Sequence, residues 1–166
     1  MSLFDRWQKI AAERPKELAL VDAKTQRRWT FGELNAEVEQ LPRLKMGYTC
    51  PAGMEVVVIF ETLRAWRDNA VVCPIEWIEP EPEWLAGMPE DTVHLKLGPG
   101  SAAKERAIRF TAEQLIADTE QIEHGMGLRP DWPNVGVISM AHSYGFSSLV
   151  LPLLLKGVPL IWVGDA

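Results

Sequence analysis

Residues 149–163 read LVLPLLLKGVPLIWV and form the longest apolar stretch of the chain. Pro152, Lys156 and Gly157 interrupt it, whereas a membrane-spanning helix needs about 20 nearly unbroken apolar residues. We therefore predict a buried helix that ends at Gly157, followed by a buried strand. A parallel strand this apolar has covering layers on both faces, so the stretch favours an α/β fold. Only three residues follow it, and we expect the fold to be incomplete within this sequence.

The residues before this stretch alternate between predicted helices and strands, which favours a largely parallel sheet flanked by helices. Thr30 and Glu33 have the spacing of a capping box, and Thr111 and Gln114 repeat it, which predicts where two helices begin. The predicted strands cover residues 18–22, 26–29, 55–60, 70–73, 92–97, 106–110, 135–139 and 158–163. Prolines and glutamates dominate residues 76–90, which predicts a surface connector.

The length and composition indicate one globular domain. Of the 166 residues, 47% are hydrophobic, which is enough for a sizeable core. We divide the chain into an opening helix–hairpin–helix unit, residues 1–50, and part of an α/β core, residues 51–166. The net charge of -6 argues against a nucleic-acid partner, because duplex-binding surfaces are basic. No signal peptide is visible, and Cys50 and Cys73 fit free thiols in a reducing cytoplasm better than a disulfide framework.

A glycine-rich loop separates two of the predicted strands. Its small residues would let backbone N–H groups converge on an anion, and its hydroxyl and cations could bind phosphate. The candidate phosphate ligands are Gly98, Gly100, Ser101, Lys104 and Arg106. The loop lacks the third glycine of a dinucleotide fingerprint and the Gly-Lys-Ser/Thr ending of a nucleotide-binding P-loop. An ordinary flexible hairpin loop is the alternative interpretation.

A second candidate site follows the strand predicted at residues 135–139, at the carboxyl end where open α/β sheets bind ligands. Here His142 with the adjacent Tyr144 and Gly145 could orient a phosphate, bind a carboxylate or line an acyl pocket. The alternative is a hydrogen-bonded structural histidine. Ser143 has no nucleophile elbow around it, so a hydrolase is not indicated. The spacing of the histidines and cysteines predicts no metal site.

Five segments, taken in order, carry a resemblance to a known family. They are PKELALVD (15–22), WTFGELN (29–35), PAGMEVVVIF with AVVCP (51–60 and 70–74), HLKLGPGSAAKERAIRF (94–110) and SMAHSYGF (139–146). Together they resemble the amino-terminal part of the acyl-adenylate-forming family, the AMP-dependent synthetases and ligases. The fourth segment occupies the place of the family's phosphate loop, and the fifth is similar to its histidine loop.

This resemblance implies the first half of the family's large domain, an α/β fold. Such enzymes activate a small carboxylic acid with ATP to an acyl-adenylate and pass the acyl group to coenzyme A or a carrier thiol. The cofactors implied are ATP, Mg²⁺ and coenzyme A. Residues 98–106 would face the β- and γ-phosphates of ATP. His142 would be the catalytic residue, and Tyr144 and Gly145 would border the acyl and nucleotide site.

The glycine-rich loop departs from the family pattern, usually written T-S-G-S/T-T-G-x-P-K/R-G/A. The departures are Gly98, Pro99, Ala102, Ala103 and Glu105. Only Gly100, Ser101 and the basic Arg106 match it. Each lost charge-assisted hydrogen bond removes about 1.5–3 kcal/mol, and a carboxylate beside phosphates adds repulsion, so we expect ATP to bind weakly or not at all.

Nothing in the sequence corresponds to the family's adenine motif, ribose-binding aspartate, hinge or closing lysine. We therefore predict an amino-terminal fragment of an ATP-dependent acid ligase that is inactive alone. The alternative is a noncatalytic α/β remnant that binds a partner or a small acid. In either case, uncovered apolar faces around residues 149–162 predict self-association.

Overall fold

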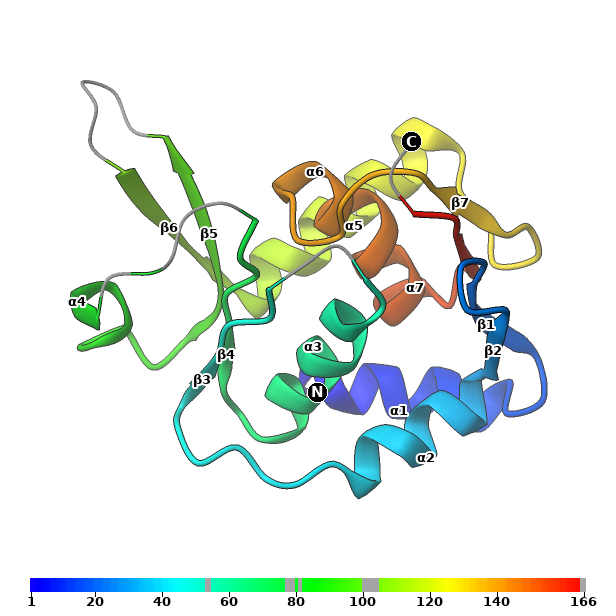
Figure 1. Cartoon of the computed structure of the whole chain (residues 1–166), viewed down its shortest axis with the longest axis horizontal. Coiled ribbons are helices and arrows are strands. Elements are labelled where there is room, and N and C mark those ends of the chain that lie inside the picture. Colours follow the sequence, from blue (N-terminus) through cyan, green and yellow to red (C-terminus); the bar gives the residue numbers. More distant parts are fainter. Residues whose placement is uncertain (53–54, 77–79, 81, 100–104, 165–166) are drawn as a thin grey trace.

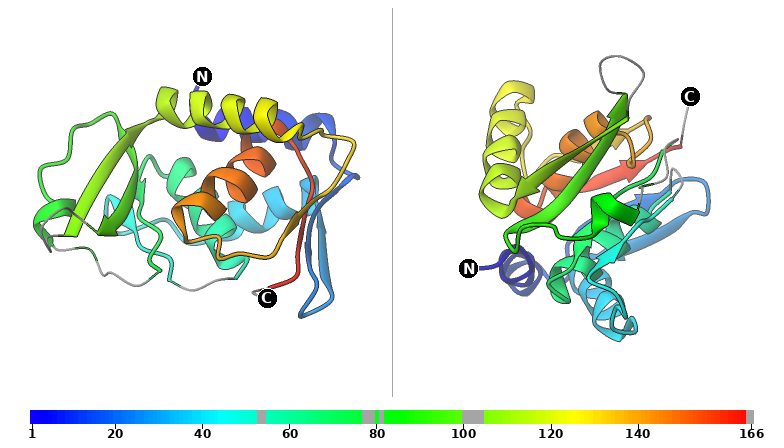
Figure 2. Two further views of the ribbon diagram at one scale, coloured as in Figure 1. Left: turned by 90° about the horizontal axis from the view of Figure 1, so that it is seen from above. Right: turned by 90° about the vertical axis from the view of Figure 1, so that its left-hand side faces the viewer.

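The computed structural model of the chain describes residues 1–52, 55–76, 80, 82–99 and 105–164. The predicted α/β class is confirmed, but the strands form two sheets of four strands each instead of one. Figures 1 and 2 show these sheets at opposite ends of the molecule, with most of the helices between them. Of the six strand pairings in the described residues, four are parallel, as the sequence predicted.

The first sheet has the strand order β2-β1-β8-β7. Its members are β1 (Leu18–Asp22), β2 (Arg27–Thr30), β7 (Asn134–Gly136) and β8 (Leu160–Trp162). β1 and β2 form the predicted antiparallel hairpin, and β8 pairs in parallel with both β1 and β7. Segments from the two ends of the chain thus lie side by side in one sheet (Figure 1).

The second sheet has the strand order β3-β4-β5-β6. Its members are β3 (Tyr48–Thr49), β4 (Val71–Val72), β5 (Thr92–Pro99) and β6 (Glu105–Thr111). β3, β4 and β5 run parallel, whereas β5 and β6 form a long antiparallel hairpin. At the end of this hairpin Gly98 pairs with Arg106, and these two described residues lie on either side of residues 100–104 of the glycine-rich loop.

The prediction of a strand at residues 55–60 is wrong, because residues 57–60 form the first turn of helix α3 (Val57–Arg67). The apolar side chains that α3 buries recur at helical spacing, with Val58, Leu63 and Trp66 among those facing the core. A run of five apolar residues, here 56–60, fits a buried helix as well as a buried strand. The helical spacing of buried side chains, which continues to Trp66, distinguishes this helix from a strand.

Three longer helices begin at capping boxes, as the sequence predicted for two of them. They are α1 (Leu3–Glu13), α2 (Phe31–Gln40) and α5 (Ala112–Met126). In each, the N-cap hydroxyl accepts an N3 backbone N–H while the N3 side chain accepts the N-cap N–H. The predicted connector at residues 76–90 contains one short helix, α4 (Pro82–Leu85).

The apolar stretch at residues 149–163 folds as a buried helix followed by a strand, as predicted. The expectation of uncovered apolar faces around residues 149–162 is wrong, because nearly all of these apolar side chains are buried within the chain itself. Helical structure runs through three consecutive elements: α6 (Ser143–Gly145), the π-helical η2 (Phe146–Val150) and α7 (Leu151–Lys156). Gly157, with a φ of 67°, ends α7 in the left-handed conformation. No helix in the described ranges is both long and apolar enough to cross a bilayer.

Candidate functional site

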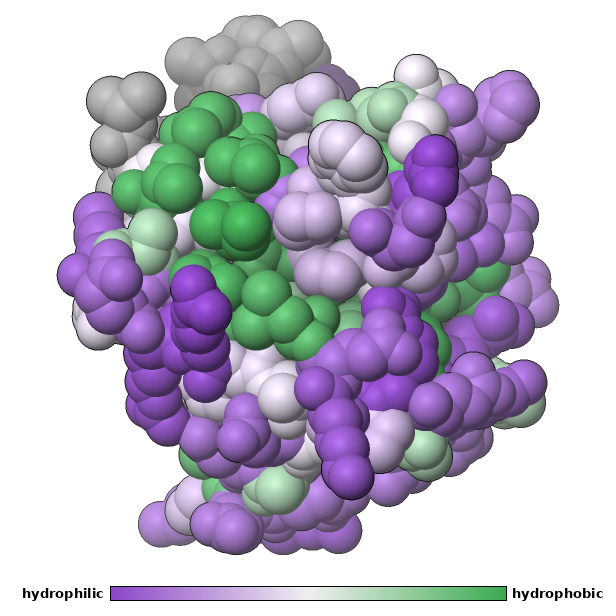
Figure 3. Space-filling model, turned by 90° about the vertical axis from the view of Figure 1, so that its right-hand side faces the viewer, coloured by the Kyte–Doolittle hydropathy of each residue, from purple (hydrophilic) through white to green (hydrophobic). Residues whose placement is uncertain are grey.

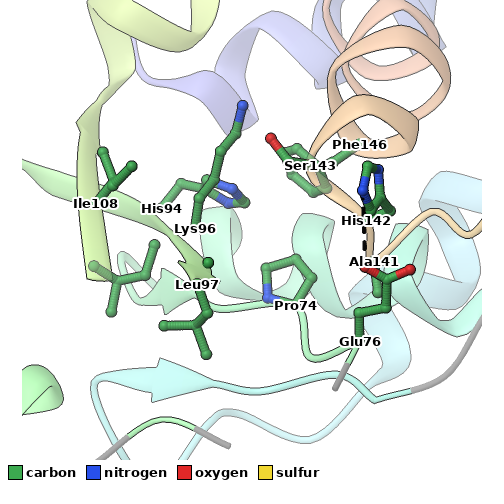
Figure 4. A pocket seen from close by; sticks show the side chains of 12 residues that line it. Pro74, Glu76, His94, Lys96, Leu97, Ile108, Ala141, His142, Ser143 and Phe146 are labelled. Atoms are coloured by element: carbon green, nitrogen blue, oxygen red, sulfur yellow. Dashed lines mark ion pairs between the residues drawn. The ribbon is translucent and has the colours of Figure 1, made fainter. Parts of the chain in front are cut away.

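A cavity of about 440 Å³ lies where the β5–β6 hairpin meets the segment that leads into α6. Pro74, Leu97, Ile108 and Phe146 give it apolar walls. Figure 4 shows polar side chains between these walls, contributed by elements far apart in the sequence. The four with titratable groups are Glu76, His94, Lys96 and His142. Cavities of this size and make-up hold small ligands that have an apolar body and one or two polar groups.

His142 lies at the amino-terminal end of α6, where it is the N-cap residue. Its Nδ1 atom accepts a hydrogen bond from the backbone N–H of Tyr144 at 3.2 Å. In the neutral imidazole the proton is therefore on Nε2, which lies 3.9 Å from Oε2 of Glu76 (Figure 4). About half of the His142 side chain is exposed, so Nε2 can donate to a ligand in the cavity.

Gly145 is buried and packs against the segment just before His142. A side chain there would place Cβ only 2.0 Å from the carbonyl oxygen of Ser139. The missing side chain therefore lets the chain turn sharply between β7 and α6. Gly145 does not line the cavity, and its contact with Ser139 positions the turn that carries His142.

Tyr144 supports His142 through its backbone. Its carbonyl oxygen accepts a hydrogen bond from the hydroxyl of Ser148 at 2.7 Å, and its N–H donates to His142. The side chain of Tyr144 is 55% exposed and does not line the cavity. Of the three residues predicted in this loop, His142 therefore lines the cavity, whereas Tyr144 and Gly145 position the turn that carries it.

The glycine-rich loop is only partly covered by the structure. Gly100, Ser101 and Lys104 lie outside the described residues. Gly98 lines the cavity, and Arg106 is its partner across the β5–β6 hairpin, on an exposed part of β6. Gly98 and His142 thus border the same space, although 44 positions separate them in the sequence.

Sequence reasoning missed His94, which the structure places in the cavity wall. Its ring stacks on Phe146 with the centroids 4.2 Å apart, and only 1% of the residue is exposed. Burial, with a smaller effect from the charge of Lys96, lowers the pKa of His94 to about 3. His94 is therefore neutral at ordinary pH. Its buried Nδ1 atom has no hydrogen-bond partner among the described residues.

Lys96 is the second residue of the cavity wall that sequence reasoning missed. Its ammonium donates to the hydroxyl of Ser147 at 3.1 Å, and that hydroxyl donates to Oδ2 of Asp118 at 2.6 Å. The same ammonium lies 4.8 Å from the ring centroid of Phe110. Partial burial lowers the pKa of Lys96, and the nearby Asp118 opposes that shift.

A sequence signal for these two residues exists in the alternation of β5. His94 and Lys96 are two positions apart, so they lie on the same face of the strand. Two nitrogen-bearing side chains on one face, just before a glycine-rich loop, indicate a polar wall. Glu76 gave no such signal, because it stands among the glutamates of the connector.

No protein-family model matches the sequence, and no curated protein matches it significantly. Solved structures do match its fold. A long-chain-fatty-acid-CoA ligase, FadD1 from Archaeoglobus fulgidus, superposes with a TM-score of 0.77 at 14% identity, over 100% of this chain and 47% of that one. O-succinylbenzoate CoA synthetase, MenE from Bacillus subtilis, in complex with the acyl-adenylate OSB-AMP, superposes with a TM-score of 0.76 at 11% identity. The match covers 98% of this chain and 56% of MenE.

A third match is VinN in complex with 3-methylaspartate, with a TM-score of 0.73 at 14% identity, over 99% of this chain and 62% of VinN. The chain therefore spans about half the length of the structures that it matches. At identities this low the likeness establishes the fold. The chain has the fold of the amino-terminal part of adenylate-forming enzymes, as the sequence resemblance predicted.

Proposed function

We propose that this chain is the amino-terminal part of an ATP-dependent carboxylic acid ligase, in which it binds the acid. The observation that carries the proposal is the cavity beside His142 in a chain with the adenylate-forming fold. In this proposal the acid is converted to an acyl-adenylate and then transferred to coenzyme A or a carrier thiol. In this proposal the 166 residues supply only part of the active site for that reaction, so they are inactive alone.

The chemistry of the cavity supports a small acid as its ligand. Pro74, Leu97 and Ile108 can cover the apolar body of the acid, and the volume of about 440 Å³ suits a small molecule. Nε2 of His142 can donate to a carboxylate oxygen, since its other nitrogen is already engaged by Tyr144. Lys96 adds positive charge at the wall formed by β5. Solved structures with this fold hold such acids, as VinN with 3-methylaspartate does.

Glu76 adds a negative charge to the cavity, opposite in sign to that of Lys96. Its carboxylate lies 3.9 Å from Nε2 of His142 and repels an anionic acid. An acyl-adenylate has lost the charge of its carboxylate, because that oxygen is then bonded to the phosphorus of AMP in a mixed anhydride, and the remaining negative charge is on the phosphate. The pair of His142 and Glu76 therefore favours the activated acyl group over the free acid.

ATP, Mg²⁺ and coenzyme A are the cofactors in this proposal. Among the described residues, Gly98 and Arg106 fit the phosphate end of ATP, because they face each other where the β5–β6 hairpin approaches its tip. MenE with this fold was solved in complex with AMP. No group of three or more metal-ligating side chains occurs in the described ranges, so no described residue is assigned to Mg²⁺.

We also propose that a second copy of the chain packs on the outer face of the first sheet, in the cytoplasm. Val135, Val137 and Val163 are exposed there by 55%, 47% and 42%. Figure 3 shows the side of the molecule that carries this sheet, with apolar residues gathered into a patch bordered by polar ones. β7, which carries Val135, is the edge strand of this sheet, so the patch reaches the border of the sheet.

Calorimetric titration tests the acid-binding role. The probes are L-aspartate, benzoate and hexanoate, which differ in polarity and apolar length. We expect at least one to bind the wild-type chain, and His142→Ala to weaken that binding about tenfold, which is about 1.4 kcal/mol. His124→Ala is the matched control, because His124 lies on α5 outside the cavity and is exposed. Equal binding by the wild type and His142→Ala would contradict the proposal.

A further inference from the structure

Cys50 and Cys73 lie opposite each other on neighbouring parallel segments. β3 and β4 pair Tyr48 with Val71 and Thr49 with Val72. The backbone N–H of Cys73 donates to the carbonyl oxygen of Thr49 at 2.9 Å, which continues this register.

The register also holds beyond the cysteines. The N–H of Ile75 donates to the carbonyl oxygen of Pro51 at 2.9 Å, and Ala52 forms a parallel bridge with Ile75. Cys50 and Cys73 therefore lie between pairings that fix them on both sides, and the backbone holds them opposite each other.

Opposite residues of a parallel ladder project from the same face of the sheet, on strands about 4.8 Å apart. That spacing falls within the Cα separations of about 4.4–6.8 Å that a disulfide spans. Both cysteines belong to one small apolar cluster, in which Cys73 is fully buried with Leu95 and the half-buried Cys50 packs against them.

The two thiols already interact with each other. The interaction of the two neighbouring thiols lowers the pKa of Cys50 and raises the pKa of Cys73, and burial raises the pKa of Cys73 further. Cys50 is thus the thiol that ionises more readily, and it is also the more exposed of the two. A thiolate with access to solvent is the form that peroxides attack.

We propose that Cys50 and Cys73 form an intramolecular disulfide when a hydroperoxide oxidises the chain. The Cys50 thiolate attacks one oxygen of hydrogen peroxide, so that an S–O bond forms, the O–O bond breaks and hydroxide leaves. The sulfur of Cys73 then attacks Cys50, forming the S–S bond, while the sulfenic hydroxyl leaves with the Cys73 proton as water. The balance is two thiols and one peroxide to one disulfide and two waters.

The link would join β3 to β4 beside the candidate site. Cys73 directly precedes Pro74, which lines the cavity, and Val72 pairs with His94 on β5. The proposal concerns the thiols alone and does not depend on the proposed ligase function.

Intact mass spectrometry of the wild-type chain provides the test. The folded, reduced chain is treated with hydrogen peroxide and quenched with N-ethylmaleimide. We expect a monomer that has lost the mass of two hydrogen atoms and takes up no maleimide. Trypsin without reduction should then release peptides 46–64 and 68–96 joined to each other, since each contains one of the two cysteines.

The single variants separate the two steps. Cys73→Ser should accumulate a sulfenic acid on Cys50 that dimedone traps, whereas Cys50→Ser should react slowly and form no sulfenic acid. Three wild-type results would overturn the proposal: both thiols still alkylated after oxidation, Cys50 over-oxidised without a cross-link, or a disulfide between two chains. Because these results come from the wild type, poor folding of a variant leaves the test intact.

Discussion

Nδ1 of His142 accepts the backbone N–H of Tyr144 at 3.2 Å, and its Nε2 lies 3.9 Å from the carboxylate of Glu76. The backbone therefore fixes which nitrogen of the ring is available to a ligand. Glu76 is the charge that this nitrogen faces when no ligand is bound. The two side chains lie next to each other on one side of the cavity, so a ligand bound beside them can contact both (Figure 4).

This relationship predicts that Glu76→Gln strengthens acid binding, the opposite of the effect expected for His142→Ala. Removing the carboxylate abolishes its repulsion of an anionic ligand but keeps a side chain of the same length. We expect the Kd of the best-bound acid to fall about three- to tenfold, which is about 0.7–1.4 kcal/mol. Calorimetric titration at low and high salt measures it, and a weaker binding by Glu76→Gln would contradict the prediction.

The buried His94 predicts a loss of stability in mild acid. Its pKa is about 3 in the folded chain, whereas an unfolded chain protonates its histidines near pH 6.5. Between these values the unfolded state binds more protons, so the free energy of unfolding falls as the pH falls. From about pH 7 to about pH 5 we expect a loss of about 2 kcal/mol from this residue.

Urea denaturation at the two pH values checks this expectation. His94→Phe serves as the comparison, since a phenyl ring can keep the stack on Phe146. The variant should lose less stability than the wild type over this range. An identical pH dependence in both chains would show that His94 is not the group responsible.

Gly145→Ala should destabilise the chain by about 2–3 kcal/mol, because the new Cβ would meet the carbonyl oxygen of Ser139 at 2.0 Å. That contact is with backbone, so the turn itself must move. Gly125→Ala is the matched control: Gly125 lies in α5 and an added Cβ there has no neighbour within 4 Å. We expect the control to be neutral or to gain up to about 1 kcal/mol of stability. Thermal unfolding distinguishes the two, and equal effects would refute the prediction.

The chain alone should catalyse no acid-dependent exchange of pyrophosphate into ATP. Adenylation requires the carboxylate in line with the α-phosphorus and charge stabilisation on both sides of it. These 166 residues contain no counterpart of the ribose-binding aspartate or closing lysine that the resemblance to adenylate-forming enzymes implies. We also expect calorimetry to give a Kd for Mg-ATP weaker than about 1 μM. Exchange by the 166 residues that His142→Ala abolishes would overturn this expectation.

Self-association should depend on the outer face of the first sheet. Val135 and Val163 are exposed on it, so the double variant Val135→Lys with Val163→Lys should repel a second copy. We expect the wild type to sediment as a concentration-dependent mixture of monomer and larger species, and the double variant to sediment as a monomer. Lysine replacement of the exposed Met126 on α5 is the control. A wild type that is monomeric at every concentration would contradict the prediction.

Features that depend on neighbouring residues could be predicted from the sequence alone. The capping boxes at Thr30 and Thr111 fixed where α2 and α5 begin, because a cap is completed within four positions. The hairpin of β1 and β2 and the helix–strand pattern around Gly157 were predictable for the same reason. His142 could be selected because its loop follows a strand and resembles a family motif.

Features that join distant segments could be established only from the three-dimensional packing of the chain. A run of apolar residues such as 56–60 is compatible with helix or strand, and packing of α3 against the core selects the helix. The division of the strands into two sheets, the approach of Glu76 to His142 and the pairing of Cys50 with Cys73 depend on long-range strand pairing and packing. Local periodicity shows which face of an element is buried, but which elements meet depends on contacts between residues far apart in the sequence.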